Sequence, residues 1–159
     1  MLYTPSALRL LGYNLRSRHW NDFPSHIMEI WFKFSTDHTI SEFAWYSTQQ
    51  HRNVMNVTHG GALVTYMDYA MAASIWDITA GGNAWTVSLN NEFLKPAKIN
   101  RWLFAQVKPM VVGDLIELEG SVRVNNSDGM LVMKSLGKFT RPKRADLENN
   151  STIFAQCWP

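Results

Sequence analysis

One carboxylate lies inside a largely apolar segment that begins at two glycines. The string NVMNVTHGGALVTYMD covers residues 53–68 and contains His59, Gly60 and Gly61, with Asp68 at its end. Apolar residues at helical spacing follow Gly60 on several faces, which predicts a helix buried on most sides. The backbone N–H groups at such a helix start can bind a phosphate or polarise a carbonyl oxygen, and the glycines leave them uncovered.

The spacing between Gly60 and Asp68 constrains how the two residues work together. Eight residues of helix correspond to about 12 Å along the axis and an angular offset of about 80°. Asp68 therefore cannot easily act on a group held at the start of its own helix. If both residues serve one site, Asp68 must come from a second copy whose helix runs antiparallel across a twofold axis. The alternative is an acid that faces water or bonds Thr65, although its neighbours one turn away are apolar.

The rest of the chain predicts an α+β domain in which a curved antiparallel sheet covers this helix. The predicted elements are an amphipathic N-terminal helix containing Leu8, Leu10, Leu11 and Leu15, a turn at 22–25, strands at 27–35 and 40–48 that form a hairpin, a loop at 53–58, the long helix from Gly60 to Gly81–Gly82, and strands at 85–94, 102–110, 115–124 and 130–140 that form a four-strand antiparallel meander. Thr58 or Asn56 is expected to cap the long helix. The expected organisation is an N-terminal helix and turn at 1–26, the domain at 27–142 and a polar tail at 143–159.

Composition narrows the class of protein. A chain of 159 residues with 46% hydrophobic residues suits one globular domain, and a net charge of +2 gives no indication of nucleic-acid binding. Asp68 and Asp77 interrupt the longest apolar stretch, so no membrane span is expected. The single cysteine, Cys157, favours a reducing compartment, and we expect a cytoplasmic protein; three arginines near the N-terminus leave organellar import open. No clustered metal ligands are visible, so neither metal nor cofactor is expected.

Two motifs together resemble a known family. Asn53, His59-Gly60-Gly61 and Asp68 form the first, and the run TVSLNNEFLKPA at residues 86–97 forms the second. They resemble the hotdog-fold acyl-CoA thioesterases of the phenylacetate-pathway (PaaI-like) type over residues 27–140. The resemblance implies a sheet wrapped around one long helix, and a homodimer or dimer of dimers with the active site at the interface.

The resemblance also implies roles for single residues in thioester hydrolysis. The backbone N–H of Gly60 would bind the thioester carbonyl, with Asn53 assisting. Asp68 of the other subunit would act as general base or nucleophile, and the hydroxyl of Thr86 would orient the water. His59 would shape the helix start without a proton-transfer role.

Further residues are candidates for binding the acyl-CoA substrate. They are Gly61, Asn90, Phe93, Lys95 and Arg141, of which the two cations would face the phosphates of CoA. The chain departs from the family at Asn56, where relatives commonly have glycine. A loop that needs a positive φ accepts asparagine, so the fold is expected to survive this change.

Two other functions remain open at this stage. A hotdog protein that binds acyl-CoA as a sensor or structural component would need no buried acid beside a polarised carbonyl. A hydratase or dehydratase on the same fold usually pairs a histidine with an acid, and His59 is nine residues from Asp68 with no other well-placed histidine.

Overall fold

The computed structural model describes residues 4–16 and 22–141. The elements are α1 (Pro5–Leu10), β1 (Asn14–Leu15), α2 (Phe23–Ile27), β2 (Ile30–Phe34), β3 (Ser41–Ser47), a 3₁₀ helix (Gln49–His51), α3 (Gly60–Ile78), β4 (Thr86–Phe93), β5 (Arg101–Val112), β6 (Leu115–Val124) and β7 (Leu131–Thr140). The predicted tail at 143–159 lies outside the described residues.

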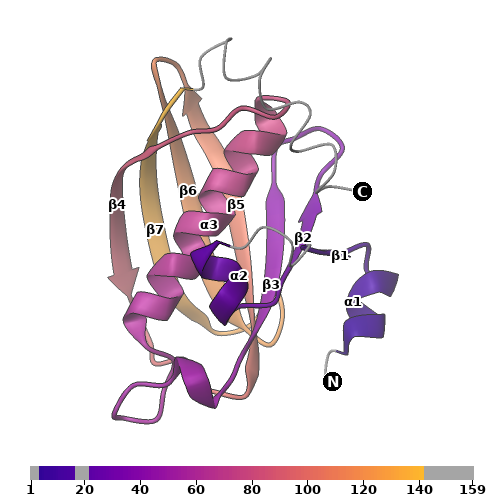
Figure 1. Ribbon diagram of the computed structural model, residues 1–159, viewed down its shortest axis with the longest axis vertical. Coiled ribbons are helices and arrows are strands. Elements are labelled where there is room, and N and C mark those ends of the chain that lie inside the picture. Colours follow the sequence, from indigo (N-terminus) through magenta and orange to yellow (C-terminus); the bar gives the residue numbers. More distant parts are fainter. Residues whose placement is uncertain (1–3, 17–21, 142–159) are drawn as a thin grey trace.

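One antiparallel sheet of seven strands wraps around α3, as the expected fold class requires (Figure 1). The strand order is β1-β2-β3-β5-β6-β7-β4. Most of the core lies between the inner face of this sheet and α3, which buries Leu63, Tyr66 and Met71 among others. The predicted α+β architecture with one central helix is therefore confirmed.

The predicted four-strand meander is wrong in one connection. Strands β5, β6 and β7 do form a meander, but β4 pairs with β7 at the far edge of the sheet. Strand β5 instead pairs with β3, so the helix α3 carries the chain across the sheet before β4 begins. Alternating hydrophobicity identifies a strand but does not reveal which strand it pairs with over a long connection.

Two glycines let α3 approach the sheet closely. A Cβ atom at Gly120 of β6 would lie 2.4 Å from Sδ of Met67, and one at Gly137 of β7 would lie 2.4 Å from Sδ of Met71. Any larger residue at either position would force these methionine side chains to move.

The N-terminal segment differs from its prediction. Helix α1 is short; Leu8 is fully buried, whereas Leu10 is 89% exposed and Leu15 belongs to β1. With Tyr13, Leu8 covers a second apolar cluster on the outer face of the sheet, so Trp31 of β2 is buried. The covering segment explains why Trp31 is apolar on a face that also carries Lys33.

The predicted turn at 22–25 is the start of α2, and it is attached to α3. The side chain of Asp22 caps α2 by accepting from the backbone N–H of Ser25 at 3.1 Å. Arg16, which is 6% exposed, donates to Asp22 and to Ser25, and its guanidinium lies 4.4 Å from the ring centroid of Tyr69 on α3. This contact with α3 holds the segment around α2 against the long helix.

Candidate active site

The start of α3 is held rigidly by the loop before it. His59, the N-cap residue, accepts a hydrogen bond at Nδ1 from the backbone N–H of Gly61 at 2.9 Å. The expected caps, Thr58 and Asn56, are wrong: Thr58 is buried with its hydroxyl 2.8 Å from that of Ser47, and Asn56 has a φ of 60°. The predicted tolerance of a positive φ at Asn56 is confirmed.

Gly60 is the first residue of α3, and its backbone N–H is free. No hydrogen bond from this N–H to another described residue is present, because the first N–H groups of a helix have no partner within it. The ring of Phe93 lies over Gly60, 3.4 Å from where a Cβ would stand. Phe93 is 54% exposed, so ring and amide together border an open surface.

Asn53 lies at the base of the same loop. Its side-chain oxygen accepts from the backbone N–H groups of Met55 at 2.9 Å and Val57 at 3.3 Å, which fixes the loop that leads to Gly60. Its amino group makes no hydrogen bond to any residue in the described ranges, so it remains able to donate to a ligand.

Asp68 is half-buried and makes one specific contact. The hydroxyl of Thr86 donates to Oδ1 of Asp68 at 2.8 Å, so it is Thr86, and not the nearby Thr65, that satisfies the acid. Asp68 is therefore less buried than the sequence-based expectation of a buried acid. A carboxylate held by one hydroxyl, with its second oxygen still reachable, is suited to accept a proton from water.

A β-bulge directs Thr86 towards α3. Strict alternation from Leu89, which faces α3, would turn Thr86 to the outer face of the sheet. The register shifts between Thr86 and Ser88, so that Thr86 stands opposite the fully buried Phe139 and faces inward. Bulges that re-aim one side chain are common beside functional sites.

Within one chain, Gly60 and Asp68 lie far apart. Helix α3 is unbroken from Gly60 to Ile78, so Gly60 and Asp68 are separated by about 12 Å along its axis. Strand β4 runs antiparallel to α3, because Thr86 at its start meets Asp68 and Phe93 at its end meets Gly60. One chain therefore places the free N–H of Gly60 at one end of β4, and Asp68 with Thr86 at the other.

The remaining candidate binding residues lie in three places. Gly61 donates its N–H to His59 and is not free. Lys95 and Arg141 are exposed near opposite ends of β4. Lys95 lies two residues after Phe93, the last residue of the strand. Arg141 follows Thr140, whose N–H donates to the carbonyl of Trp85 just before the strand begins. Asn90 is exposed on the outer face of the sheet, whereas its neighbour Asn91 faces α3. Period-two alternation with Leu89 and Phe93 is the signal in the sequence that identifies Asn91.

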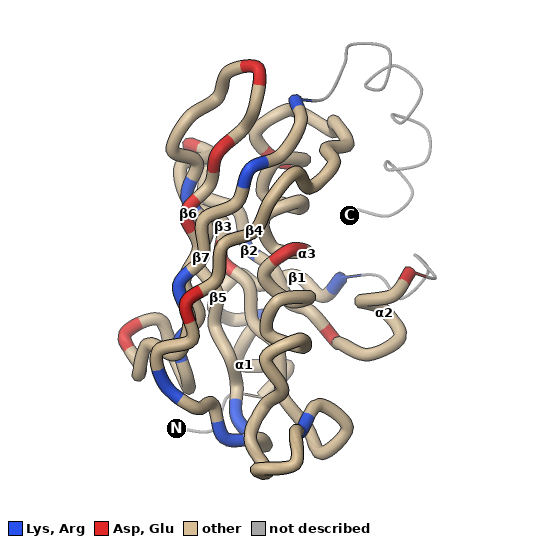
Figure 2. The backbone as a smooth tube through the Cα atoms, turned by 90° about the vertical axis from the view of Figure 1, so that its left-hand side faces the viewer, with Lys and Arg blue, Asp and Glu red and all other residues tan. Residues whose placement is uncertain are grey.

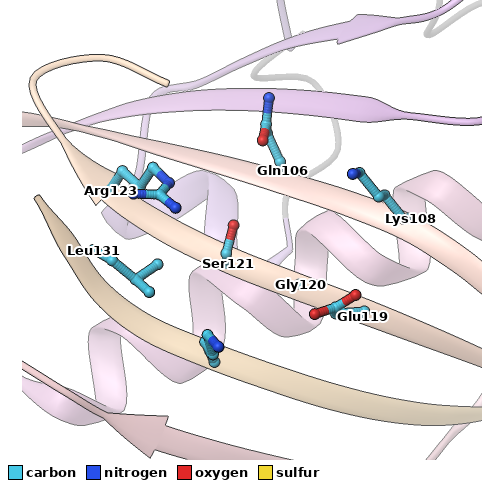
Figure 3. Close-up of a pocket in the computed structure, with 8 residues that line it drawn as sticks. Gln106, Lys108, Glu119, Gly120, Ser121, Arg123 and Leu131 are labelled. Carbon is cyan, nitrogen blue, oxygen red and sulfur yellow. The ribbon is translucent and has the colours of Figure 1, made fainter. Parts of the chain in front are cut away.

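The outer face of the sheet has pockets of its own. One, of about 180 Å³, is lined by Asn90, Glu92, Glu119, Lys134, Ser135 and Leu136. Another is lined by none of the candidate residues. Figure 3 shows the residues that line this pocket, whose volume is about 190 Å³. The residues that line it are Gln106, Lys108, Glu119, Gly120, Ser121, Arg123, Leu131 and Lys134. Charged residues of both signs follow these strands, whereas α3 carries only Asp68 and Asp77 (Figure 2). The mixed charge is typical of a solvated sheet face.

Two structural absences can be stated for residues 4–16 and 22–141. No group of three or more His, Cys, Asp and Glu side chains there is placed to hold a metal ion. None of the helices in these ranges is both long and apolar enough to cross a membrane.

Comparison with known proteins places this arrangement in context. Residues 55–132 match the family model described as the thioesterase superfamily. No curated protein matches the sequence significantly.

Solved structures similar to this chain include three informative ones. Zebrafish thioesterase superfamily member 2 superposes with a TM-score of 0.67 at 17% identity over 87% of this chain and 99% of that chain. The PaaI protein from the phenylacetic acid degradation operon of E. coli gives 0.61 at 18% identity over 88% and 86%. A Streptococcus mutans protein bound to acetyl-CoA gives 0.62 at 17% identity over 73% and 91%. At these identities the likeness establishes the fold.

Proposed function

We propose that this chain, whose residues 55–132 belong to the thioesterase superfamily and whose fold is the hotdog fold, hydrolyses an acyl-CoA thioester to a free acid and CoA. The observation that carries the proposal is the hydrogen bond of 2.8 Å from Thr86 to Asp68. It links an acid on α3 to a hydroxyl that a β-bulge has turned inward, and bulges that re-aim one side chain are common beside functional sites.

The complete site is proposed to form between two copies of the chain. Among the described strands, β4 is at the sheet edge and pairs on one side only, and next to its ends it exposes Trp85 (79%) and Leu94 (45%). Antiparallel pairing of two β4 strands about their midpoint brings Thr86 of one copy opposite the partner's Phe93. Asp68 of one copy then lies beside the partner's Gly60, which closes the gap of about 12 Å within one chain.

In this arrangement each group has one task. The N–H of Gly60, with the amino group of Asn53, binds the thioester carbonyl oxygen, which gains negative charge as water adds to the carbonyl carbon. The partner's Asp68 takes the proton from that water while the partner's Thr86 hydroxyl fixes the carboxylate. The tetrahedral intermediate then collapses, the carbon–sulfur bond breaks, and the CoA sulfur leaves and receives a proton.

CoA is the proposed carrier because of the relatives and the surface charges. The Streptococcus mutans structure contains acetyl-CoA, and a Streptococcus pneumoniae hypothetical thioesterase was solved with coenzyme A. In the twofold arrangement Arg141 of one copy and Lys95 of the partner lie at the same end of the paired strands. Two cations there suit the phosphates of CoA.

Thiol release from a panel of acyl-CoAs tests the proposal directly. We expect wild-type protein to hydrolyse at least one member, and Asp68→Asn to lose about 10²- to 10⁴-fold of that rate while binding and assembly persist. Asp77→Asn is the matched control, because Asp77 is the other acid of α3 and pairs with His38 instead. Tight binding of an acyl-CoA without turnover in wild type would instead indicate a sensor.

A further inference from the structure

The inner face of β4 carries a polar pair in an otherwise apolar wall. Asn91 stands opposite Ser135 of β7, and the Ser135 hydroxyl donates to Oδ1 of Asn91 at 2.6 Å. Ser135 is 2% exposed. The neighbours on the same face are apolar: Leu89, Phe93 and Met133. The hydrogen bond to Asn91 offsets the cost of burying the Ser135 hydroxyl, so the pair is a stable polar feature within an apolar wall.

The hydrogen bond from Ser135 fixes how Asn91 is oriented. Its oxygen is engaged, so its amino group points away from β7. That amino group makes no hydrogen bond to another residue of the described ranges, and it is not among the polar atoms that are sealed from solvent. Asn91 therefore presents two N–H donors, held in one direction, to the surface beside α3.

The position of Asn91 relates it to the proposed carbonyl site. It lies two residues before Phe93, whose ring covers Gly60. Two residues of strand span about 6 to 7 Å. From Gly60, Asn91 lies towards the middle of β4, whereas Lys95 lies beyond the end of the strand. An acyl group that runs towards the middle of the paired strands passes Asn91, while the CoA portion leaves in the direction of the cations.

We infer that Asn91 determines acyl specificity by donating a hydrogen bond to an oxygen of the acyl group. Ser135 is the positioning residue that orients the Asn91 amide. The inference rests on the proposed function and names its substrate class: acyl-CoAs whose acyl group carries a hydroxyl or carbonyl oxygen beyond the thioester carbonyl. A site built to donate to such an oxygen discriminates against the analogue that lacks it.

Matched pairs of substrates test this inference. Saturated acyl-CoAs of increasing length are compared with the same chains bearing a hydroxyl or keto group at successive positions. In wild type, kcat/KM should favour one oxygenated member over its oxygen-free partner. Asn91→Asp keeps the acceptor for Ser135 and loses both donors, so this preference should fall about tenfold or more. Ser135→Ala should lower it by a smaller factor, because the amide is then free to turn.

The neighbouring residue supplies the control. Leu136→Asp adds the same charge next to Ser135 on the outer face of the sheet, where Leu136 is 52% exposed, and the preference should stay at the wild-type value. Calorimetry should measure the same preference in the affinities of each matched substrate pair for the Asp68→Asn protein, which does not turn them over. Size-exclusion chromatography of the Asn91 variants should show wild-type assembly.

Three results would overturn the inference. The first is an unchanged preference in Asn91→Asp. The second is an equal loss for all substrates, which would place the accepting oxygen on the CoA arm. The third is dissociation of the assembly, which would make Asn91 an interface residue. Failure of the proposed function is distinct, since wild type would then hydrolyse neither member of any pair.

Discussion

The chemistry of the site depends on which face of β4 each side chain occupies. Thr86 reaches Asp68 only because the register shifts after it, so Val87, although next in the chain, is 54% exposed and outside this contact. We expect Thr86→Val to lower kcat by about tenfold, through the loss of a hydrogen bond to a charged group. Val87→Thr should have little effect, as measured by thiol release.

Exchanging Thr86 and Val87 in one variant tests whether the bulge alone decides which residue reaches Asp68. In a strand without a bulge, position 87 would share the inward face with Leu89, and the variant Thr86→Val/Val87→Thr would keep a hydroxyl near Asp68. In the bulged strand this double variant should be as slow as Thr86→Val alone. Recovery of wild-type activity in the double variant would contradict the register described here.

The candidate site residues could be predicted from the sequence more readily than the contacts they make. The separation of Gly60 and Asp68 followed from helix geometry alone, and the structure keeps it. The cap at His59 and the bulge at Thr86 did not follow, because both depend on local backbone angles that many sequences can adopt. Asn91 was overlooked in favour of Asn90, although alternation along the strand already separates the two.

Among the elements, the far end of α3 is tied to the β2–β3 turn by one ion pair. Nδ1 of His38 lies 2.9 Å from Oδ2 of Asp77, and His38 has a φ of 56°. The hydrogen bond to Asp77 and its negative charge raise the pKa of His38 above its ordinary value of 6.5. A raised folded-state pKa means that the stabilisation is fully present below about pH 6.5 and disappears as pH rises through the raised value.

Unfolding by urea at two pH values checks this contribution. His38→Asn preserves a residue type that tolerates a positive φ and removes the ion pair. We expect its unfolding midpoint to lie below that of wild type at about pH 5.5 and to approach it at about pH 8.5. Asp77→Asn should show the same pH dependence. An equal deficit at both pH values would mean that the pair contributes no charge interaction.

Strand positions and lengths followed from hydrophobic alternation, but the order of the strands did not. The predicted strands at 85–94 and 115–124 correspond closely to β4 and β6. The placement of β4 at the far edge depends on the path of α3 across the sheet, which is a property of three-dimensional packing. This difference matters for function, because only an edge strand can pair with a second copy.

For the whole molecule, the proposed twofold pairing divides one site between two chains. Asp68 and Thr86 come from one copy, and Gly60 comes from the other. A variant that lacks the acid half and a variant that lacks the amide half should therefore complement each other when mixed. Gly60→Pro removes the N–H cleanly, since proline suits the first helical position and His59 already has the extended backbone (φ −61°, ψ 136°) that precedes proline.

We expect Asp68→Asn and Gly60→Pro to be nearly inactive when each is assayed alone. After unfolding and refolding together, random pairing should restore about a quarter of wild-type activity, because half of the dimers are mixed and each mixed dimer contains one intact site. Asp68→Asn mixed with Thr86→Val is the control, and it should show no gain above the residual activity of Thr86→Val, because both changes damage the same half-site. If each chain held a complete site of its own, neither mixture would recover activity, and the separation of the two half-sites along α3 would then have to be bridged within one chain.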